Sequence, residues 1–385
     1  MKPHLKKTVE SLMMGPGKNG FFLLRFFLHS ASICSGGAVK LRTALFNRQI
    51  LKSKRLPCTV ISIGNLTMGG TGKTPMTIYV AHLVQRLGYR PAVVSRGYKG
   101  RREKSGGIVS DGIGILLKAE DSGDEAFMLA RELKNIPVLV GQNRFRSGMQ
   151  AISRFKANVI ILDDGFQHLK LKRDIDLVLL DDTRPLGNGY LFPRGILREP
   201  VSALKRAGAV IFTRCSEENK EMPPCLPTRL RHPFFRSFHT PYVKEIVRAS
   251  AGMAGVPDNG PSDDFSFLSG CKAVVFSGIA KNNEFCRMVE DLGCQVTRFA
   301  SFPDHHWYCP EDFRFIRAEI EKTGVELLIT TDKDYARIEG KFTWPVDLVV
   351  MGIKISLKDQ KDAFSVFLEK RLAEIHINKQ PSGYI

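Results

Sequence analysis

The stretch TMGGTGKT, residues 67–74, constrains the fold more than any other part of the sequence. Its glycines let backbone N–H groups approach phosphate oxygens, while a lysine and a threonine can hold the β- and γ-phosphates and Mg²⁺. A β-branched run, residues 58–63, precedes the loop, and a helical stretch, residues 75–87, follows it. Strand, loop and helix in this order predict a P-loop and a nucleotide-binding α/β fold.

The loop departs from the general P-loop motif at its first position, where a threonine replaces the expected glycine. A plain glycine-rich turn is the alternative interpretation, but the flanking strand and helix favour a phosphate site. The predicted cofactor-binding residues are Thr67, Met68, Gly69, Gly70, Thr71, Gly72, Lys73 and Thr74. Thr74 is also a predicted metal ligand.

Apolar runs that are typical of buried strands recur after the loop, at residues 92–95, 137–140, 159–162, 175–180 and 209–212. Helical patterns lie between them, at residues 124–133 and 143–155. This alternation predicts an α/β fold with a P-loop NTPase-like parallel sheet and helices on both faces.

A segment rich in Gly, Pro and Asp, residues 251–264, is the predicted domain boundary. Strand and helix patterns resume after it and predict a second, smaller α/β domain. We therefore expect three regions: an N-terminal helix region at residues 1–45, a P-loop domain at 46–250, and the smaller domain at 251–385. The final helical segment, residues 358–374, can pack on either domain.

Two carboxylates, Asp163 and Asp164, end the apolar run at residues 159–162. A carboxylate at the carboxyl edge of a parallel sheet can bind the Mg²⁺ of a bound nucleotide, so both are predicted metal ligands. Capping of the next turn is the alternative role. The sequence TDKD at residues 331–334 does not fit the guanine-recognition motif, which favours ATP over GTP.

The chain carries 57 Lys and Arg against 39 Asp and Glu, a formal net charge of +18, so its surface should attract polyanions. No zinc-finger spacing or aromatic RNA-binding signature is visible, and we expect no nucleic-acid partner. The eight cysteines are scattered, without a Cys-x-x-Cys pair. They indicate a reducing compartment, on the cytoplasmic side of a membrane.

An apolar segment near the N-terminus, residues 21–34, follows a lysine-rich start. Arg25 and His29 interrupt it, so it is too short and too charged for a typical transmembrane helix. On a helix, Arg25, His29 and Ser32 share one stripe, and Phe and Leu cover most of the rest. This pattern favours a helix in the membrane interface, and a helix buried in the protein core is the alternative.

Several further stretches occur in a specific order: GNLTMGGTGKTP, SRGYKG, SGDEAFMLA, VGQNR, DDGFQH, RDIDLVLLD, GILREP, FPDHHWY and TDKDYAR. Together with the loop, they resemble the tetraacyldisaccharide 4′-kinases, membrane-associated P-loop kinases of lipid A biosynthesis. The resemblance covers residues 65–337. This family also has threonine at the position of Thr67, so the departure from the general motif becomes a family trait.

The resemblance implies a kinase that uses ATP and Mg²⁺ and phosphorylates the 4′-hydroxyl of an acylated glucosamine disaccharide 1-phosphate. It implies Asp124 as the base toward that hydroxyl, assisted by His305, with domain closure bringing the two together. It also implies catalytic roles for Lys73 and Arg144. By the same resemblance, Glu199 is expected near the metal and Glu125, Gln167 and His168 near the substrate.

These features predict an enzyme at the cytoplasmic face of the inner membrane, bound through its N-terminal helix. They favour a monomer but do not determine the oligomeric state. Two alternatives from other classes remain. One is a P-loop ATPase or GTPase switch coupled to a membrane partner, which would need only water as acceptor. The other is a membrane-surface scaffold with a vestigial P-loop, which the intact Lys73, Thr74 and Asp163 disfavour.

Overall fold

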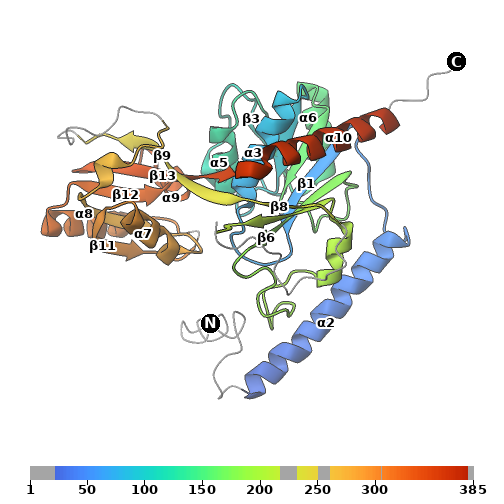
Figure 1. Cartoon of the computed structure of the whole chain (residues 1–385), viewed down its shortest axis with the longest axis horizontal. Coiled ribbons are helices and arrows are strands. Elements are labelled where there is room, and N and C mark those ends of the chain that lie inside the picture. The colour runs from blue at the N-terminus through green and yellow to red at the C-terminus, as the bar shows by residue number, and fades with distance from the viewer. Residues whose placement is uncertain (1–21, 217–231, 250–260, 305, 380–385) are drawn as a thin grey trace.

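The computed structural model describes residues 22–216, 232–249, 261–304 and 306–379. Two β-sheets form two units, which lie side by side in Figure 1. His305 lies outside the described residues, as does most of the boundary segment predicted at residues 251–264.

The first unit is built on an eight-stranded sheet with the order β3-β4-β2-β5-β1-β6-β7-β8. All neighbouring strands in it are parallel except β3 and β4. The strands are β1 (Thr59–Asn65), β2 (Pro91–Ser95), β3 (Gly107–Ser110), β4 (Val138–Val140), β5 (Val159–Asp163), β6 (Ile175–Asp181), β7 (Ala209–Thr213) and β8 (Phe234–Arg236). The central strands β1, β5 and β6 are buried along their whole length, which explains why they are rich in apolar and β-branched residues.

Helices cover both faces of this sheet, as the sequence predicts. On one face α3 (Lys73–Arg86) and α5 (Asp124–Glu132) pack against residues such as Ile61 and Ile161. On the other face α6 (Arg144–Phe155) packs against Val60 and Ile160, and the 3₁₀ helix η1 (Val201–Arg206) against Val178. A short helix, α4 (Ala119–Ser122), leads into α5.

The second unit contains a five-stranded sheet with the order β11-β10-β12-β13-β9. Its strands are β9 (Phe238–Val247), β10 (Lys272–Ser277), β11 (Gln295–Ser301), β12 (Leu327–Thr331) and β13 (Asp347–Ser356). Its helices are η2 (Ser266–Leu268), α7 (Asn282–Asp291), α8 (Pro310–Thr323) and α9 (Asp332–Ile338). Only the β13–β9 pair is antiparallel. Strand β9 therefore belongs to the second sheet although it precedes the boundary segment.

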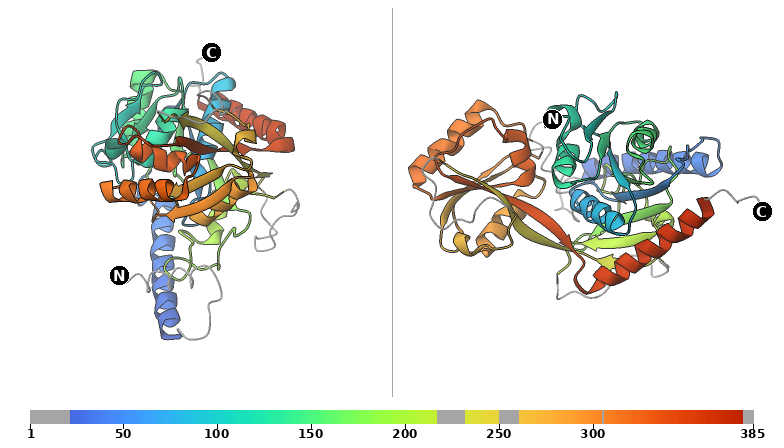
Figure 2. Two further views of the ribbon diagram at one scale, coloured as in Figure 1. Left: turned by 90° about the vertical axis from the view of Figure 1, so that its left-hand side faces the viewer. Right: turned by 90° about the horizontal axis from the view of Figure 1, so that it is seen from above.

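A two-stranded ribbon of β9 and β13 connects the units (Figure 2). Its strands pair in antiparallel fashion from Leu348↔Val247 to Ser356↔Phe238, with one register shift between Val350 and Met351. At the end of the ribbon the chain re-enters the first unit through η3 (Lys358–Gln360) and α10 (Lys361–Lys379). Phe364, Leu368 and Leu372 of α10 are fully buried in the core that contains α3. The final helix thus packs on the P-loop unit.

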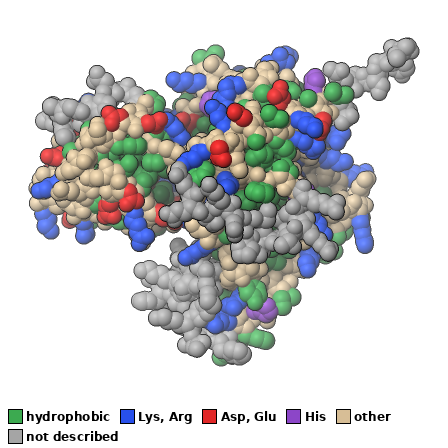
Figure 3. Space-filling model, viewed as in Figure 1, with side chains coloured by type: hydrophobic (Ala, Val, Ile, Leu, Met, Phe, Trp, Pro, Cys, Tyr) green, Lys and Arg blue, Asp and Glu red, His purple; other side chains and the backbone are tan. Residues whose placement is uncertain are grey.

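Helix α2 (Phe22–Asn47) projects from the first unit in Figure 1. Its Ser32 is buried and donates a hydrogen bond to the Leu191 carbonyl, so part of the polar stripe faces the protein. Leu23, Phe26 and Phe27 instead are 58–70% exposed. Within the described residues, no helix has the length and apolar character needed to cross a bilayer. On the face drawn in Figure 3, basic side chains are spread over both units.

Candidate active site

The predicted phosphate loop connects β1 to α3. Gly72 caps α3 in the left-handed conformation, with φ 79° and ψ 24°, and Gly69 has φ 109°. The Asn65 side chain donates a 2.8 Å hydrogen bond to the Thr71 hydroxyl and so fixes the loop from the end of β1. The loop amides therefore converge at the N-terminus of α3, where a phosphate binds favourably.

Thr67 explains the departure from the general P-loop motif. It is 2% exposed and forms an isolated bridge with Leu197, while the next amide, that of Met68, donates to the Ile196 carbonyl at 2.7 Å. The start of the loop is therefore a short strand-like contact with the segment after residue 194. In this extended, buried position a β-branched residue suits the backbone better than glycine does.

Asp163 and Asp164 leave the end of β5 beside this loop, but in different environments. Asp163 is 1% exposed and accepts hydrogen bonds from Thr77 and Ser95, both at 3.2 Å. Burial raises the pKa of Asp163 to about 6, and the nearby carboxylates of Glu125 and Asp164 act in the same direction. An acid with this pKa is still mostly ionised at neutral pH.

Asp164 is held instead by two cations. Arg198 donates to both of its oxygens at 3.0 Å, and the Lys73 ammonium lies 3.8 Å from Oδ1. Burial alone would raise the pKa of Asp164, but Lys73 and Arg198 outweigh it and lower the value. The lysine of the loop and the carboxylates of β5 therefore meet at one edge of the sheet, as expected for a nucleotide site.

This set fits a magnesium ion bound together with a nucleotide. Mg²⁺ usually takes one or two carboxylates plus phosphate oxygens and waters, and seldom a complete protein cage. The described residues contain no cluster of three or more His, Cys, Asp or Glu side chains suited to a metal. Asp163 and Asp164 are carboxylates of the kind that such a site uses, and Thr74, the second residue of α3, remains a predicted ligand.

A basic cavity of about 980 Å³ opens next to Asp164. Several cationic side chains line it. They come from α2, from the segment that follows α2, from the chain that follows β2, β4 and β5, and from the segment before η1: Arg42, Lys52, Lys54, Arg96, Lys104, Arg144, Lys170 and Arg198. Among the described residues that line it, Asp164 is the only acidic one. A cavity with this charge is suited to a ligand that carries phosphate.

Arg144 is the most buried cation of this cavity, at 3% exposed. It donates to the carbonyls of Gly141 at 3.0 Å and Asp163 at 3.4 Å, and its Nε has no hydrogen-bond partner. Burial lowers the pKa of Arg144 to about 10, although Asp163 and Asp164 oppose the shift. The guanidinium thus stays charged at neutral pH and is held rigidly beside the β5 carboxylates.

The predicted substrate residues Gln167 and His168 line the same cavity. The Gln167 amide donates to the Asn65 carbonyl at 2.8 Å, which ties it to the strand before the P-loop. Burial lowers the pKa of His168 to about 4, and nearby cations, chiefly Arg144 and Arg173, add to the effect. His168 is therefore a neutral imidazole at physiological pH.

The sequence is similar to proteins that share one description. The sequence profile of the family "Tetraacyldisaccharide-1-P 4′-kinase" (LpxK) matches residues 24–373. The chain belongs to this family. Proteins named tetraacyldisaccharide 4′-kinase are similar along most of their length: 40% identity over 86% of this chain and 89% of the Syntrophus aciditrophicus protein, and 37% over 96% and 98% for Desulfatibacillum aliphaticivorans.

A solved structure agrees with this assignment. The crystal structure described as the "apo" form of LpxK from Aquifex aeolicus in complex with ATP matches 91% of this chain and 99% of that protein. The TM-score is 0.71 at 29% sequence identity. The predicted family and the predicted P-loop kinase fold are both confirmed.

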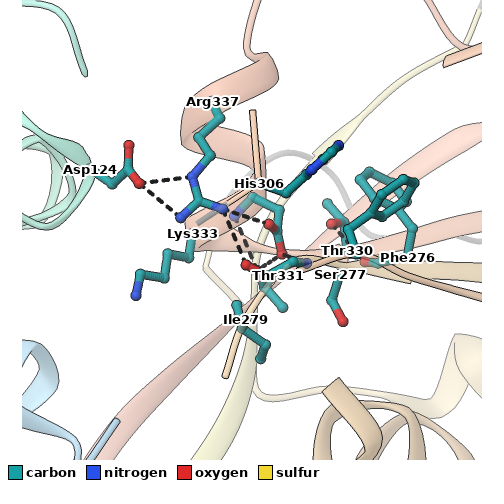
Figure 4. A network of polar contacts seen from close by, with 12 residues as sticks. Asp124, Phe276, Ser277, Ile279, His306, Thr330, Thr331, Lys333 and Arg337 are labelled. Atoms are coloured by element: carbon teal, nitrogen blue, oxygen red, sulfur yellow. Dashed lines mark hydrogen bonds and ion pairs between the residues drawn. The ribbon is translucent and has the colours of Figure 1, made fainter. Parts of the chain in front are cut away.

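Asp124, the base implied by the family, begins α5 and is 7% exposed. Its Oδ2 accepts hydrogen bonds from Arg337 of α9, at 2.9 Å from Nε and 2.8 Å from Nη2 (Figure 4). Its expected assistant, His305, lies outside the described residues. The neighbouring His306 is bonded to Asp312 at 2.8 Å and stacks on Phe302.

The remaining two carboxylates among the predicted site residues form ion pairs. Glu125 lies 3.6 Å from the ammonium of Lys333, which comes from the second unit. Glu199 is buried and accepts a 2.7 Å bond from Arg206 of η1. Sequence reasoning gave no role to Arg198 or Arg337, although both lie in stretches, GILREP and TDKDYAR, that carry the resemblance.

Proposed function

We propose that this chain transfers the γ-phosphate of ATP to the 4′-hydroxyl of a tetraacyldisaccharide 1-phosphate in lipid A biosynthesis, giving lipid IVA. The observation that carries the proposal is the pairing of the P-loop lysine with a carboxylate at the mouth of a basic cavity. Lys73 lies 3.8 Å from Asp164, and Asp164 lines that cavity. Donor and acceptor sites would then meet at the β5 edge, in a chain of this kinase family.

The donor half follows from P-loop chemistry. The loop amides and Lys73 would hold the β- and γ-phosphates, and Thr74, Asp163 and Asp164 would hold Mg²⁺, with Glu199 nearby. When bound, the ion would neutralise charge on the phosphates. Arg144, rigid and charged beside Asp163, would stabilise the transferred phosphoryl group.

The acceptor half needs a base, because a sugar hydroxyl is a poor nucleophile. Asp124 is the proposed base, with His305 as its assistant. The basic cavity would take the phosphorylated sugar head, contacted by Gln167, His168 and Glu125. Arg42 and Phe46 of α2 line this cavity, so acyl chains leaving it can extend along the exposed apolar side of that helix.

A direct test is incubation of the purified protein with labelled ATP, Mg²⁺ and an acylated glucosamine disaccharide 1-phosphate. We expect one labelled phosphate per ATP consumed, located on the 4′-oxygen. An ATPase or GTPase switch would release phosphate to water at the same rate with or without the lipid. That result would refute the kinase proposal.

The base assignment is tested with Asp124→Asn. We expect kcat to fall by about 10²–10⁴-fold, the usual contribution of a general base, with ATP affinity close to wild type. Glu120→Gln is the matched control, because Glu120 lies four residues earlier, in α4, and also pairs with a cation of the second unit, Lys341, at 3.4 Å. Near-normal turnover of Asp124→Asn would remove Asp124 from the mechanism.

We further propose that the protein acts as a monomer at the cytoplasmic face of the inner membrane, with α2 in the membrane interface. Support comes from Leu23, Phe26, Phe27 and Ile33, which are 58–70% exposed along one helix. Phe26→Ser with Phe27→Ser should weaken sedimentation with anionic lipid vesicles. Val366→Ser on α10 also removes a 62% exposed apolar side chain and should leave it unchanged. Equal effects of both changes would exclude α2 as the contact.

A further inference from the structure

Arg337 is a charged side chain with no role in the mechanism above, yet it is completely buried. It extends from α9 of the second unit toward Asp124 of the first (Figure 4). Besides its two bonds to Asp124, it donates to Asp334 at 2.9 Å and to the Gly278 carbonyl at 3.3 Å. A buried guanidinium is costly unless carboxylates and hydrogen bonds compensate it, and here two carboxylates do so.

The guanidinium of Arg337 is also bound within its own unit, through Asp334. Asp334 accepts from the Thr331 hydroxyl at 2.6 Å and from the Gly278 amide at 3.0 Å, so its carboxylate cannot turn freely. Asp334 holds one arm of the guanidinium, and the plane of that group then sets where Oδ2 of Asp124 must lie. Nε and Nη2 of Arg337 both contact Oδ2 of Asp124.

The packing of α5 on the second unit has other ionic contacts that do not involve Asp124. Arg131 of α5 pairs with Glu245 of β9 at 2.6 Å and with Glu339, which directly follows α9, at 3.1 Å. Lys244 of β9 pairs with Glu132 of α5 at 2.5 Å. The Asp124–Arg337 bond is therefore not needed merely to hold the units together. It is distinguished by its burial and by its place at the first turn of α5, next to Glu125, which faces Asp163 and Lys333.

We infer that Arg337 is a positioning residue for phosphoryl transfer: it holds the Asp124 carboxylate ionised and oriented toward the acceptor hydroxyl from the opposite unit. This inference rests on the proposed function, in which Asp124 is the base. It adds that the base is complete only while α9 is docked on α5. The second unit then contributes directly to catalysis through a side chain that never touches the substrate.

The test compares Arg337→Gln and Arg337→Lys in the full-length protein, assayed with ATP and the acylated disaccharide 1-phosphate. For Arg337→Gln we expect kcat to fall about 10²-fold, the cost of a misplaced catalytic group, with KM for both substrates nearly unchanged. The acid limb of kcat/KM should move up by about 1–3 pH units, because a cation favours the ionised form of a nearby carboxylate. Arg337→Lys keeps the charge but not the planar fork, and should show a smaller fall in kcat and a smaller shift.

Arg131→Gln is the matched control, since it removes an arginine from the same contact between α5 and the second unit without touching Asp124. It should leave kcat and the acid limb unchanged. A folded Arg337→Lys with wild-type kcat and pH profile would overturn the inference, and so would equal losses in Arg337 and Arg131 variants. If Arg337→Gln does not fold, the kcat and pH profile of Arg337→Lys alone decide whether the inference holds.

A double variant separates this inference from the proposed function. If Arg337 acts through Asp124, Arg337→Gln should cost almost nothing further in an Asp124→Asn background. A fully additive loss there would refute the positioning role while leaving the kinase proposal intact. Absence of lipid phosphorylation by the wild-type protein would instead refute the proposed function itself.

Discussion

Replacement of Gly72 by alanine tests how closely the P-loop packs against β9. The glycine has φ 79°, a conformation that costs an L-residue about 1–2 kcal/mol. A Cβ at this position would lie 2.7 Å from Nε2 and 3.1 Å from Cε1 of His239 on β9. Forcing an extra carbon into such a contact costs about 1–3 kcal/mol. We therefore expect the free energy of unfolding to fall by about 2–5 kcal/mol in total.

Gly70→Ala is the matched control from the same loop. A Cβ there would have only the Arg214 Nη2 as a neighbour, at 3.9 Å, and the backbone needs no positive φ. Its free energy of unfolding without nucleotide should stay within about 0.5 kcal/mol of wild type. Unfolding should be followed by circular dichroism, because both tryptophans, Trp307 and Trp344, lie outside the P-loop unit.

The double variant Gly72→Ala with His239→Ala isolates the steric part. Removing the imidazole makes room for the new Cβ, so the two changes together should cost about 1–3 kcal/mol less than their sum. Strict additivity would show that His239 does not press on the loop. Equal stability of Gly72→Ala and Gly70→Ala would refute both the backbone and the steric argument.

Two further predictions concern stability. Phe364→Ala should lower the free energy of unfolding by about 3–5 kcal/mol, since this ring is fully buried and lies 4.9 Å from the Phe235 ring, whereas Val366→Ala, 62% exposed on the same helix, should change it little. The pKa of His168 is lowered to about 4 in the folded protein, so between pH 6.5 and 4 the unfolded chain binds more protons and stability falls as pH falls. His168→Gln should therefore lose less thermal stability between pH 7 and pH 5 than the wild type, and an unchanged pH dependence would contradict the lowered pKa.

The sequence predicted those elements whose signal is local. β1, β5 and β6 are rich in apolar and β-branched residues, and the P-loop is one short motif between a strand and a helix. Strands β3 and β8 have only four and three residues and lie at sheet edges, so no run of apolar residues marks them. β9 was also missed: it contains Pro241 and is only partly buried, as an edge strand can be.

The site residues also divide into those with a local sequence signal and those without one. Lys73, Asp163 and Asp164 follow from motifs and from the rule that parallel strands present their carboxyl ends at one edge. The partners of the carboxylates do not: Arg198 is 34 residues from Asp164, and Arg337 is 213 residues from Asp124. The Asp124–Arg337 pair depends on how the two units dock, and the Asp164–Arg198 pair depends on how two loops of the first unit come together. Periodicity and spacing encode neither. The family resemblance includes both sequence stretches but implied no functional role for either arginine.

The return of the chain through β13 into α10 has a consequence for the order of folding during synthesis. The second sheet needs only residues from β9 to β13 and can form as soon as these have left the ribosome. The P-loop unit, although it is translated first, must wait for Phe364, Leu368 and Leu372 to cover its apolar face. Loss of a few turns from the C-terminus should therefore impair the nucleotide-binding unit, at the opposite end of the sequence, more than the unit that lies next to it in the chain.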